Sequence, residues 1–290
     1  MGMASSLRGL WALTDRELKK WYKVPTVLIL SLIQPIIWLA FFGKSMNMAN
    51  FFAGTSLNIP GLNIPKQIID EIAQVVLKAN FGTTDYFSFL AASMVTQITF
   101  FTSMQSGMSI VWDRRFGILE KLLTTPVPRA NILMGKVFNS VIRSLAQATI
   151  ILLIATLLGM KYASGLTPVS LALRLLGTYA ALTLLSLGFS ALYLMLALRS
   201  TNWQSQMAIM NLLNLPLMFA SNSFYPVKTM PWWLRPIALV NPLSYSNNVV
   251  RGLLLGLNVN IALSFAYLAI FAAVFSVLGI VMAWRFLNMG

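Results

Sequence analysis

The chain has 290 residues, of which 58% are hydrophobic and only 10% are charged. Soluble domains carry about a quarter charged residues, so this composition excludes an ordinary soluble domain and indicates a multi-pass membrane protein. Because cysteine and histidine are absent, the chain has no disulfide, no cysteine nucleophile and no imidazole base or metal ligand. The net charge of +14 fits basic residues beside anionic membrane lipids, so we expect no nucleic-acid partner.

Residues 1–23 predict a cytoplasmic amphipathic helix that lies along the membrane surface. Apolar residues recur there at helical spacing, and tryptophans at the edge of the apolar side suit the headgroup layer. The predicted interfacial residues are Leu10, Trp11, Leu18 and Trp21. A solvated tail is the weaker alternative, and we expect no cleavable signal because no small-x-small site follows the apolar run.

Six apolar stretches are long enough to cross a bilayer core, which needs about 20 mostly apolar residues. They are 24–43, 87–111, 137–160, 171–198, 205–224 and 261–284. The expected fold class is an all-α polytopic membrane protein with residues 24–290 as its transmembrane domain. Segments assigned to the inside carry 12 Lys and Arg against 7 outside, which places both termini in the cytoplasm of a plasma or inner membrane.

Two outer segments are predicted to contain short helices. One helix is expected at 66–79 in the 44–86 loop, packed on the outer face. In 225–260, Asn241 followed by Pro242 predicts a helix start, capped by the asparagine and ending near residue 258. That helix would span about 24 Å, short for a crossing, so we expect a re-entrant segment in the outer leaflet. A seventh span is the alternative, and it would place the C-terminus outside.

The distribution of acidic residues excludes several mechanisms. Glu120 is the last acid in the chain, and all seven acids lie in predicted tails and loops. Ion-coupled transporters commonly use membrane-buried carboxylates or histidines, so ion coupling by this chain alone is not expected. The same deficit argues against an intramembrane enzyme, and no phosphate-binding loop is found. We therefore expect no catalytic residue, metal or cofactor on this chain.

The loop 112–136 contains an amphipathic segment at 116–129. Asp113 is expected to cap a helix there, and Pro126 and Pro128 to end it. Its apolar side comprises Ile118, Leu119, Leu122 and Leu123, with Glu120 and Lys121 off that side. Taken alone, these residues favour an ordinary helix at the membrane surface.

Two motifs resemble a known family. The run Arg114-Arg115-Phe116-Gly117-Ile118-Leu119-Glu120-Lys121-Leu122-Leu123-Thr124-Thr125-Pro126-Val127-Pro128-Arg129 resembles the cytoplasmic signature of type-2 ABC exporter permeases, which include daunorubicin-resistance-like and polysaccharide-export-like subunits. The later motif, with Asn241, Pro242, Tyr245 and Arg251, resembles the family's outer-helix landmark. The resemblance covers nearly the whole chain and specifies no substrate.

The resemblance implies a half-transporter. Two permease subunits, identical or different, would each sit on a separate ATP-binding subunit that holds ATP and Mg²⁺, two copies per complex. The implied ATPase-coupling helix comprises Phe116, Ile118, Leu119, Glu120, Lys121, Leu122, Leu123 and Arg129. The implied translocation path runs between the second and fifth spans, with Gln97, Phe101, Met104, Asn211, Asn214, Met218 and Asn222 as candidates.

Each polar candidate on the path fits helix–helix hydrogen bonding equally well, and Met and Phe fit plain packing. Because no charge is expected at mid-membrane, we predict export of hydrophobic or amphiphilic substrates, a drug or a lipid. Lipid-linked polysaccharide is the alternative cargo. A passive channel or scaffold without an ATPase is the alternative from another class.

Overall fold

The computed structural model describes residues 3–45, 66–125, 128–199 and 202–288, and within these ranges the chain forms helices and turns but no strand. The elements in chain order are α1 (Met3–Tyr22), α2 (Pro25–Trp38), the π-helix η1 (Leu39–Ser45), α4 (Lys66–Phe81), α5 (Tyr86–Arg115), α6 (Ile118–Leu123), α7 (Arg129–Leu157), α8 (Pro168–Arg199), α9 (Trp203–Phe219), the 3₁₀-helix η2 (Val227–Thr229), α10 (Arg235–Val240), α11 (Pro242–Leu255) and α12 (Ile261–Asn288). The all-α class is confirmed.

In the part of the chain that the structure describes, four helical segments are long and apolar enough to cross a membrane: Gln74–Arg115, Ala130–Leu157, Pro168–Leu198 and Ile261–Met282. The first predicted span corresponds to α2 continued by the π-helix η1, and the fifth to α9. With 17 residues, α9 is about 26 Å long, shorter than a usual crossing. The count of six spans therefore stays a prediction.

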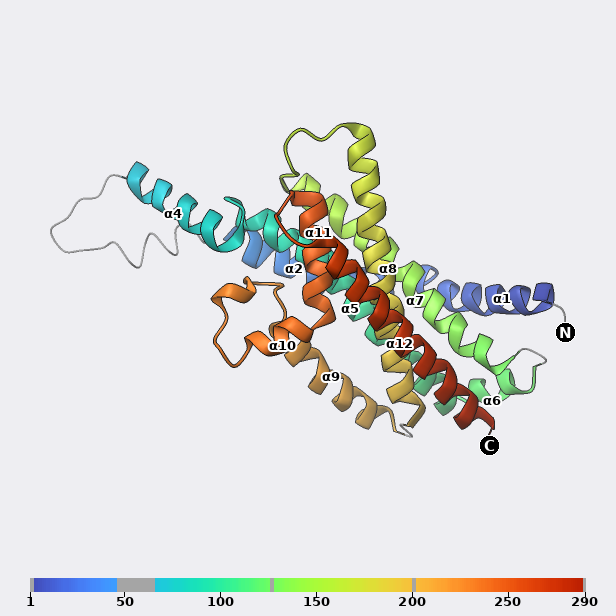
Figure 1. Cartoon of the computed structure of the whole chain (residues 1–290). Coiled ribbons are helices and arrows are strands. Elements are labelled where there is room, and N and C mark those ends of the chain that lie inside the picture. Colours follow the sequence, from blue (N-terminus) through green and yellow to red (C-terminus); the bar gives the residue numbers. More distant parts are fainter. Residues whose placement is uncertain (1–2, 46–65, 126–127, 200–201, 289–290) are drawn as a thin grey trace.

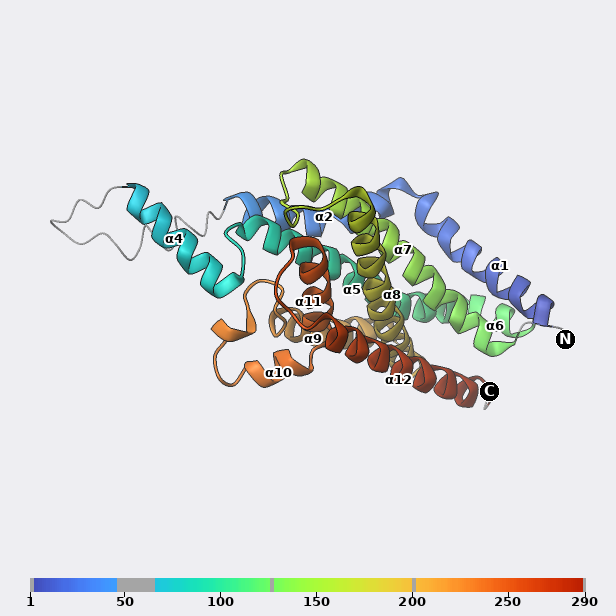
Figure 2. The ribbon, with the colours of Figure 1, turned by 45° about the horizontal axis from the view of Figure 1, so that its top comes forward.

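The helices form an elongated bundle with two distinct ends. Figure 1 and Figure 2 show α1, α6 and the last turns of α12 at one end, whereas α4 lies at the other. The helix predicted at 66–79 is confirmed as α4, and the beginning of the 44–86 loop lies outside the described residues. The N-terminal helix, the loop helix and the C-terminal helix thus share one end, as an even number of crossings requires.

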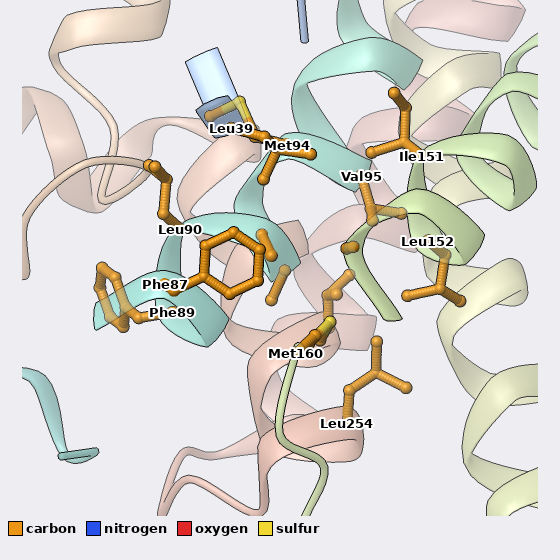
Figure 3. Packing of buried hydrophobic residues seen from close by; sticks show 14 of the residues in the cluster. Leu39, Phe87, Phe89, Leu90, Met94, Val95, Ile151, Leu152, Met160 and Leu254 are labelled. Carbon is orange, nitrogen blue, oxygen red and sulfur yellow. The ribbon is translucent and has the colours of Figure 1, made fainter. Parts of the chain in front are cut away.

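α5 is the central helix of the bundle. In its most apolar stretch of 18 residues, 89% of the residues are buried, whereas the same share for α12 is 11%. Figure 3 shows Leu90, Met94 and Val95 of α5 within one core cluster that includes Leu39 of η1 and Ile151 of α7. A helix surrounded on all sides has no solvent face, which explains why α5 lacks a regular apolar stripe.

Small and hydroxyl residues let α5 approach its neighbours closely. A Cβ built at Gly107 would lie 2.6 Å from the backbone oxygen of Tyr193 on α8, so only glycine fits there. Ser103 Oγ donates to Ser186 Oγ on α8 at 3.1 Å. Both Ser103 and Gly107 are thus used for helix contacts within this chain.

The segment 225–260 forms η2, α10 and α11. Asn241 caps α11 by accepting a hydrogen bond from the Leu243 N–H at 3.0 Å, with Pro242 in the first turn, as predicted. Gly256 ends the helix at φ +72°, three residues earlier than expected. The Asn241 amide also donates to Leu217 O at 2.7 Å, and this bond ties α11 to the end of α9. α11 packs on α5, α8 and α12.

Arg251 lies in the predicted helix α11 and is only 2% exposed. Its guanidinium lies 3.4 Å from the ring centroid of Phe89 and donates to the Phe89 carbonyl and the Ser93 hydroxyl of α5. It also donates to the carbonyls of Asn222 and Ser223, at 2.7 and 2.8 Å. Arg251 therefore holds three segments together through backbone acceptors.

Replacing Arg251 should destabilise the fold strongly. Arg251→Leu leaves several buried acceptors without a donor, and we expect a loss of about 3 kcal/mol or more, measured by unfolding in mixed micelles. The exposed Lys161→Met at the same end removes one charge and should leave stability unchanged. Equal stability of Arg251→Leu and the wild-type chain would contradict a structural role.

Candidate functional site

α6 is a short helix set at an angle to α5 by one glycine. α5 ends at Arg115, and Gly117 adopts φ +66° before α6 begins at Ile118. Phe116 stacks on Trp112 with centroids 5.6 Å apart, and Trp112 stacks on Trp203 of α9 at 5.8 Å. The aromatic stack fixes the exit from α5 against the start of α9.

The predicted apolar side of α6 faces the chain itself. Leu119 is 4% exposed and belongs to the core, and Leu122 and Leu123 pack partly against it. Phe116, Glu120 and Lys121 are exposed. A partner at this end would therefore meet an aromatic and charged surface rather than the leucines. Arg129, placed in the coupling helix by the resemblance, begins α7 instead.

Asp113 does not cap α6, contrary to the sequence prediction. It lies in the last turns of α5, 2% exposed, and accepts from Lys136 Nζ of α7 at 2.6 Å. Lys136 also lies 3.6 Å from Glu17 of α1. Arg16 and Lys20 of α1 contact the same two acids at 2.9–3.4 Å. We call these five residues the ion cluster; it joins α1, α5 and α7 beside α6.

An exposed pair on α1 contrasts with the ion cluster. Lys19 Nζ lies 2.5 Å from Asp15 Oδ2 one turn away, and the hydrogen bond and charge of Asp15 raise the pKa of Lys19. Lysine stays protonated at neutral pH in either case. The pair therefore adds little, because solvent screens it.

α1 is the predicted amphipathic helix, but a different side of it meets the protein. Thr14, Glu17 and Trp21 are buried against the bundle, Leu10 and Leu18 are half-buried, and Trp11 is 64% exposed. A Cβ at Gly135 of α7 would lie 3.0 Å from Leu13, so α1 packs closely on α7. The polar ion cluster, which hydrophobic spacing cannot detect, sets this orientation.

A large cavity opens between α1, α2, α5, α6, α7 and α9. Its volume is about 920 Å³. Its lining runs along α5 from Asp113 to Ile98, about 22 Å of helix, and includes Phe116 and Ile118 beside α6. The cavity thus begins at the loop helix and extends into the membrane-spanning bundle.

Four of the seven predicted path residues line this cavity: Phe101, Met104, Asn211 and Asn214. The other three lie elsewhere. Gln97 is buried, and its amide has no partner among the described residues. Met218 belongs to the core, and Asn222 donates to Asn248 of α11 at 2.7 Å.

The sequence reasoning missed Arg143 in the cavity wall. α7 begins at Arg129, eight residues before the predicted span, so Arg143 lies at the midpoint of the helix rather than near its end. The earlier start also puts Lys136 inside α7. A helix start directly after Pro128 was the available signal, since proline favours the beginning of a helix.

The sequence pattern of the family described as ABC-2 type transporter matches residues 8–255, a range that includes α5, α6, α7 and α9. The chain belongs to this family. The transport permease ycf38 of Porphyra purpurea is 27% identical over 241 residues, which cover 83% of this chain and 72% of the relative. The daunorubicin resistance ABC transporter permease protein DrrB1 of Streptomyces coeruleorubidus is 25% identical over 60% of each chain. The multidrug ABC transporter permease YbhR of Escherichia coli K12 is 27% identical over 58% of this chain and 44% of the relative.

The chain is therefore a multi-pass transmembrane subunit of an ABC transporter. Members of this family lack an ATPase site of their own, so membership implies an ATP-binding partner subunit. For this permease, the sequence interpretation of the motif at 114–129 is confirmed at the level of the family. The roles of individual residues in that motif stay predictions.

The ion cluster gives a stability test. Asp113→Asn leaves the buried Lys136 without its 2.6 Å carboxylate, and we expect a loss of about 3 kcal/mol, measured by unfolding in mixed micelles. Faster proteolysis of α1 should accompany it. The matched control Asp15→Asn removes the same charge from the exposed pair and should change neither readout. Wild-type stability of Asp113→Asn would show that the cluster does not hold α1.

Proposed function

We propose that this permease exports hydrophobic or amphiphilic compounds, a drug or a lipid, from the cytoplasmic side of the membrane. The cavity carries the proposal. Its volume of about 920 Å³ lies in the range of drug-sized ligand sites, roughly 300–1,000 Å³. Phe101 and Met104 give it adaptable apolar walls, and Asn211 and Asn214 add uncharged polar groups. Printed names of relatives, daunorubicin resistance and multidrug, support a drug as cargo.

The proposed complex contains two permease subunits, identical or different, and two ATP-binding subunits. ATP and Mg²⁺ bind to the ATP-binding subunits, and this chain holds no cofactor. α6 docks on the ATP-binding subunit, with Phe116, Glu120 and Lys121 as the outward surface. The buried Leu119 fixes α6 to the bundle, so a displacement of α6 reaches α5 and the cavity.

The docking surface can be tested by charge reversal. Glu120→Lys combined with Lys121→Glu keeps the net charge and the fold but inverts the exposed pattern, so we expect at least a tenfold loss of substrate-stimulated ATPase activity in the complex. Lys78→Glu on the exposed side of α4, at the opposite end, is the control. Unchanged co-purification and unchanged stimulation in the double variant would refute docking through α6.

The proposal places α1, α6 and the end of α12 in the cytoplasm. The excess of Lys and Arg in the segments assigned to the inside supports this orientation.

A topology reporter tests the orientation directly. A green fluorescent protein fused after Gly290 should fluoresce, because this reporter is active in the cytoplasm. An alkaline phosphatase fused at the same place should stay inactive, because this reporter is active only outside the cytoplasm. A fusion within 161–167, between α7 and α8, should give the opposite pair of results. An active phosphatase after Gly290 would support a seventh crossing in 225–260.

A lipid-linked glycan is the second candidate cargo. Trp112 and Phe116 line the cavity next to α6, and aromatic faces of this kind can stack on sugar rings. Stimulation of the partner ATPase by a lipid-linked oligosaccharide but by no drug would favour it. Transport without an ATP-binding subunit would instead favour a passive channel.

A further inference from the structure

Arg143 is a cation in the cavity wall that forms no ion pair with a described residue, although Glu17 attracts it from a greater distance. Its guanidinium lies 5.5 Å from the ring centroid of Trp21 on α1, a cation–π distance. None of the described residues forms a hydrogen bond or an ion pair with it, and its buried Nε has no partner. The Trp21 Nε1 donor beside it is also buried and unpaired within the described chain.

The neighbouring charges do not neutralise Arg143. The ion cluster sets two acids, Glu17 and Asp113, against three bases, so it already carries one excess positive charge. Arg143 adds a second positive charge to the same end of the cavity. A partly buried cation whose enclosed Nε lacks an acceptor is costly, and an anionic ligand group would reduce that cost.

Arg251 shows what a structural arginine looks like in this fold. Its guanidinium is fully enclosed and donates to carbonyls and a hydroxyl of two other segments, α5 and the turn at 222–223. Arg143, at the midpoint of the long helix α7, has no such acceptors among the described residues. Its cost is therefore not compensated within the described chain, which indicates a ligand rather than a packing role.

The cavity lining has a polar part around Arg143 and a separate apolar part. Asn139 and Gln147, one turn to each side on α7, add amide groups to the wall. The apolar part of the lining comprises Leu30, Ile98, Phe101, Met104 and Met108. A ligand with an acidic head and an apolar tail would match both parts.

We propose that the cavity takes an amphiphile with a phosphate or carboxylate head, whose acidic group binds Arg143 beside Trp21 and whose tail lies along α5. A guanidinium can donate two parallel N–H groups to one acid, a geometry that suits carboxylate and phosphate oxygens. This binding site names the substrate class of the proposed function. Transport of the amphiphile rests on the proposed function, whereas binding of the amphiphile does not.

The test measures binding to the full-length permease alone, in phosphatidylcholine nanodiscs. Lysophosphatidic acid with a fluorescent tail is the anionic probe, and a monoacylglycerol with the same tail is the neutral-head probe. Arg143→Gln should weaken binding of the anionic probe about tenfold or more and leave the neutral-head probe unchanged, whereas Arg143→Lys should retain part of the affinity. Lys23→Gln removes one exposed charge near Trp21, outside the cavity lining, and should bind as the wild-type chain does.

Several outcomes would overturn the proposal. Wild-type affinity of a folded Arg143→Gln variant for the anionic probe would refute the subsite, as would equal losses in Arg143→Gln and Lys23→Gln. Displacement of the probe by millimolar inorganic phosphate alone would show a free-anion site and refute the amphiphile. If Arg143→Gln binds normally while the α6 double variant loses ATPase stimulation, the subsite fails and the export function stands. The reverse pair of results would leave the subsite and remove the export function.

Discussion

The burial of α5 on all sides from Tyr86 to Phe100 is the constraint on which the rest of the structure depends. A helix in this position must find partners for every polar group inside the protein. At one end, Arg251 bonds to Phe89 and Ser93. At the other end, Asp113 accepts from Lys136. Gly107 allows close contact in between. α5 is therefore tied at both ends, and movement of α5 must carry α1, α7 and α11 with it.

Under the proposed docking of α6, this attachment would give the loop helix a mechanical role. Only Phe116 and Gly117 separate α5 from α6, and the Phe116 ring is held in a stack with Trp112 and Trp203. Leu119 anchors α6 in the same core as α5. The ion cluster binds α1 within reach of the same end. A force on the outer surface of α6 would reach α5 and the cavity lining directly, because packed cores transmit displacement with little compression.

Much of the fold follows from local sequence signals. Apolar runs predict the long helices, the Asn241–Pro242 pair predicts the start of α11, and the helix at 66–79 is found as α4. Hydropathy alone begins the third span at residue 137, at the first strongly apolar residues, and so misses the first two turns of α7. The helix itself begins at Arg129, since the polar first turns are stabilised by packing on α1. No local pattern reveals such a tertiary contact.

The candidate site is harder to predict for the same reason. The direction of Leu119 and the partner of Asp113 depend on residues of α7 and α1 that are distant in the sequence. A pattern analysis also counts every arginine alike, although the described cations differ in their surroundings. Arg251 donates to carbonyls and Lys136 to a carboxylate, whereas the partly buried Arg143 faces the cavity without a hydrogen bond or ion pair to a described residue. The other unpaired groups in the cavity are neutral. Arg143 would therefore make the cavity bind acidic head groups more tightly than neutral ones, even where its apolar walls accept many tails.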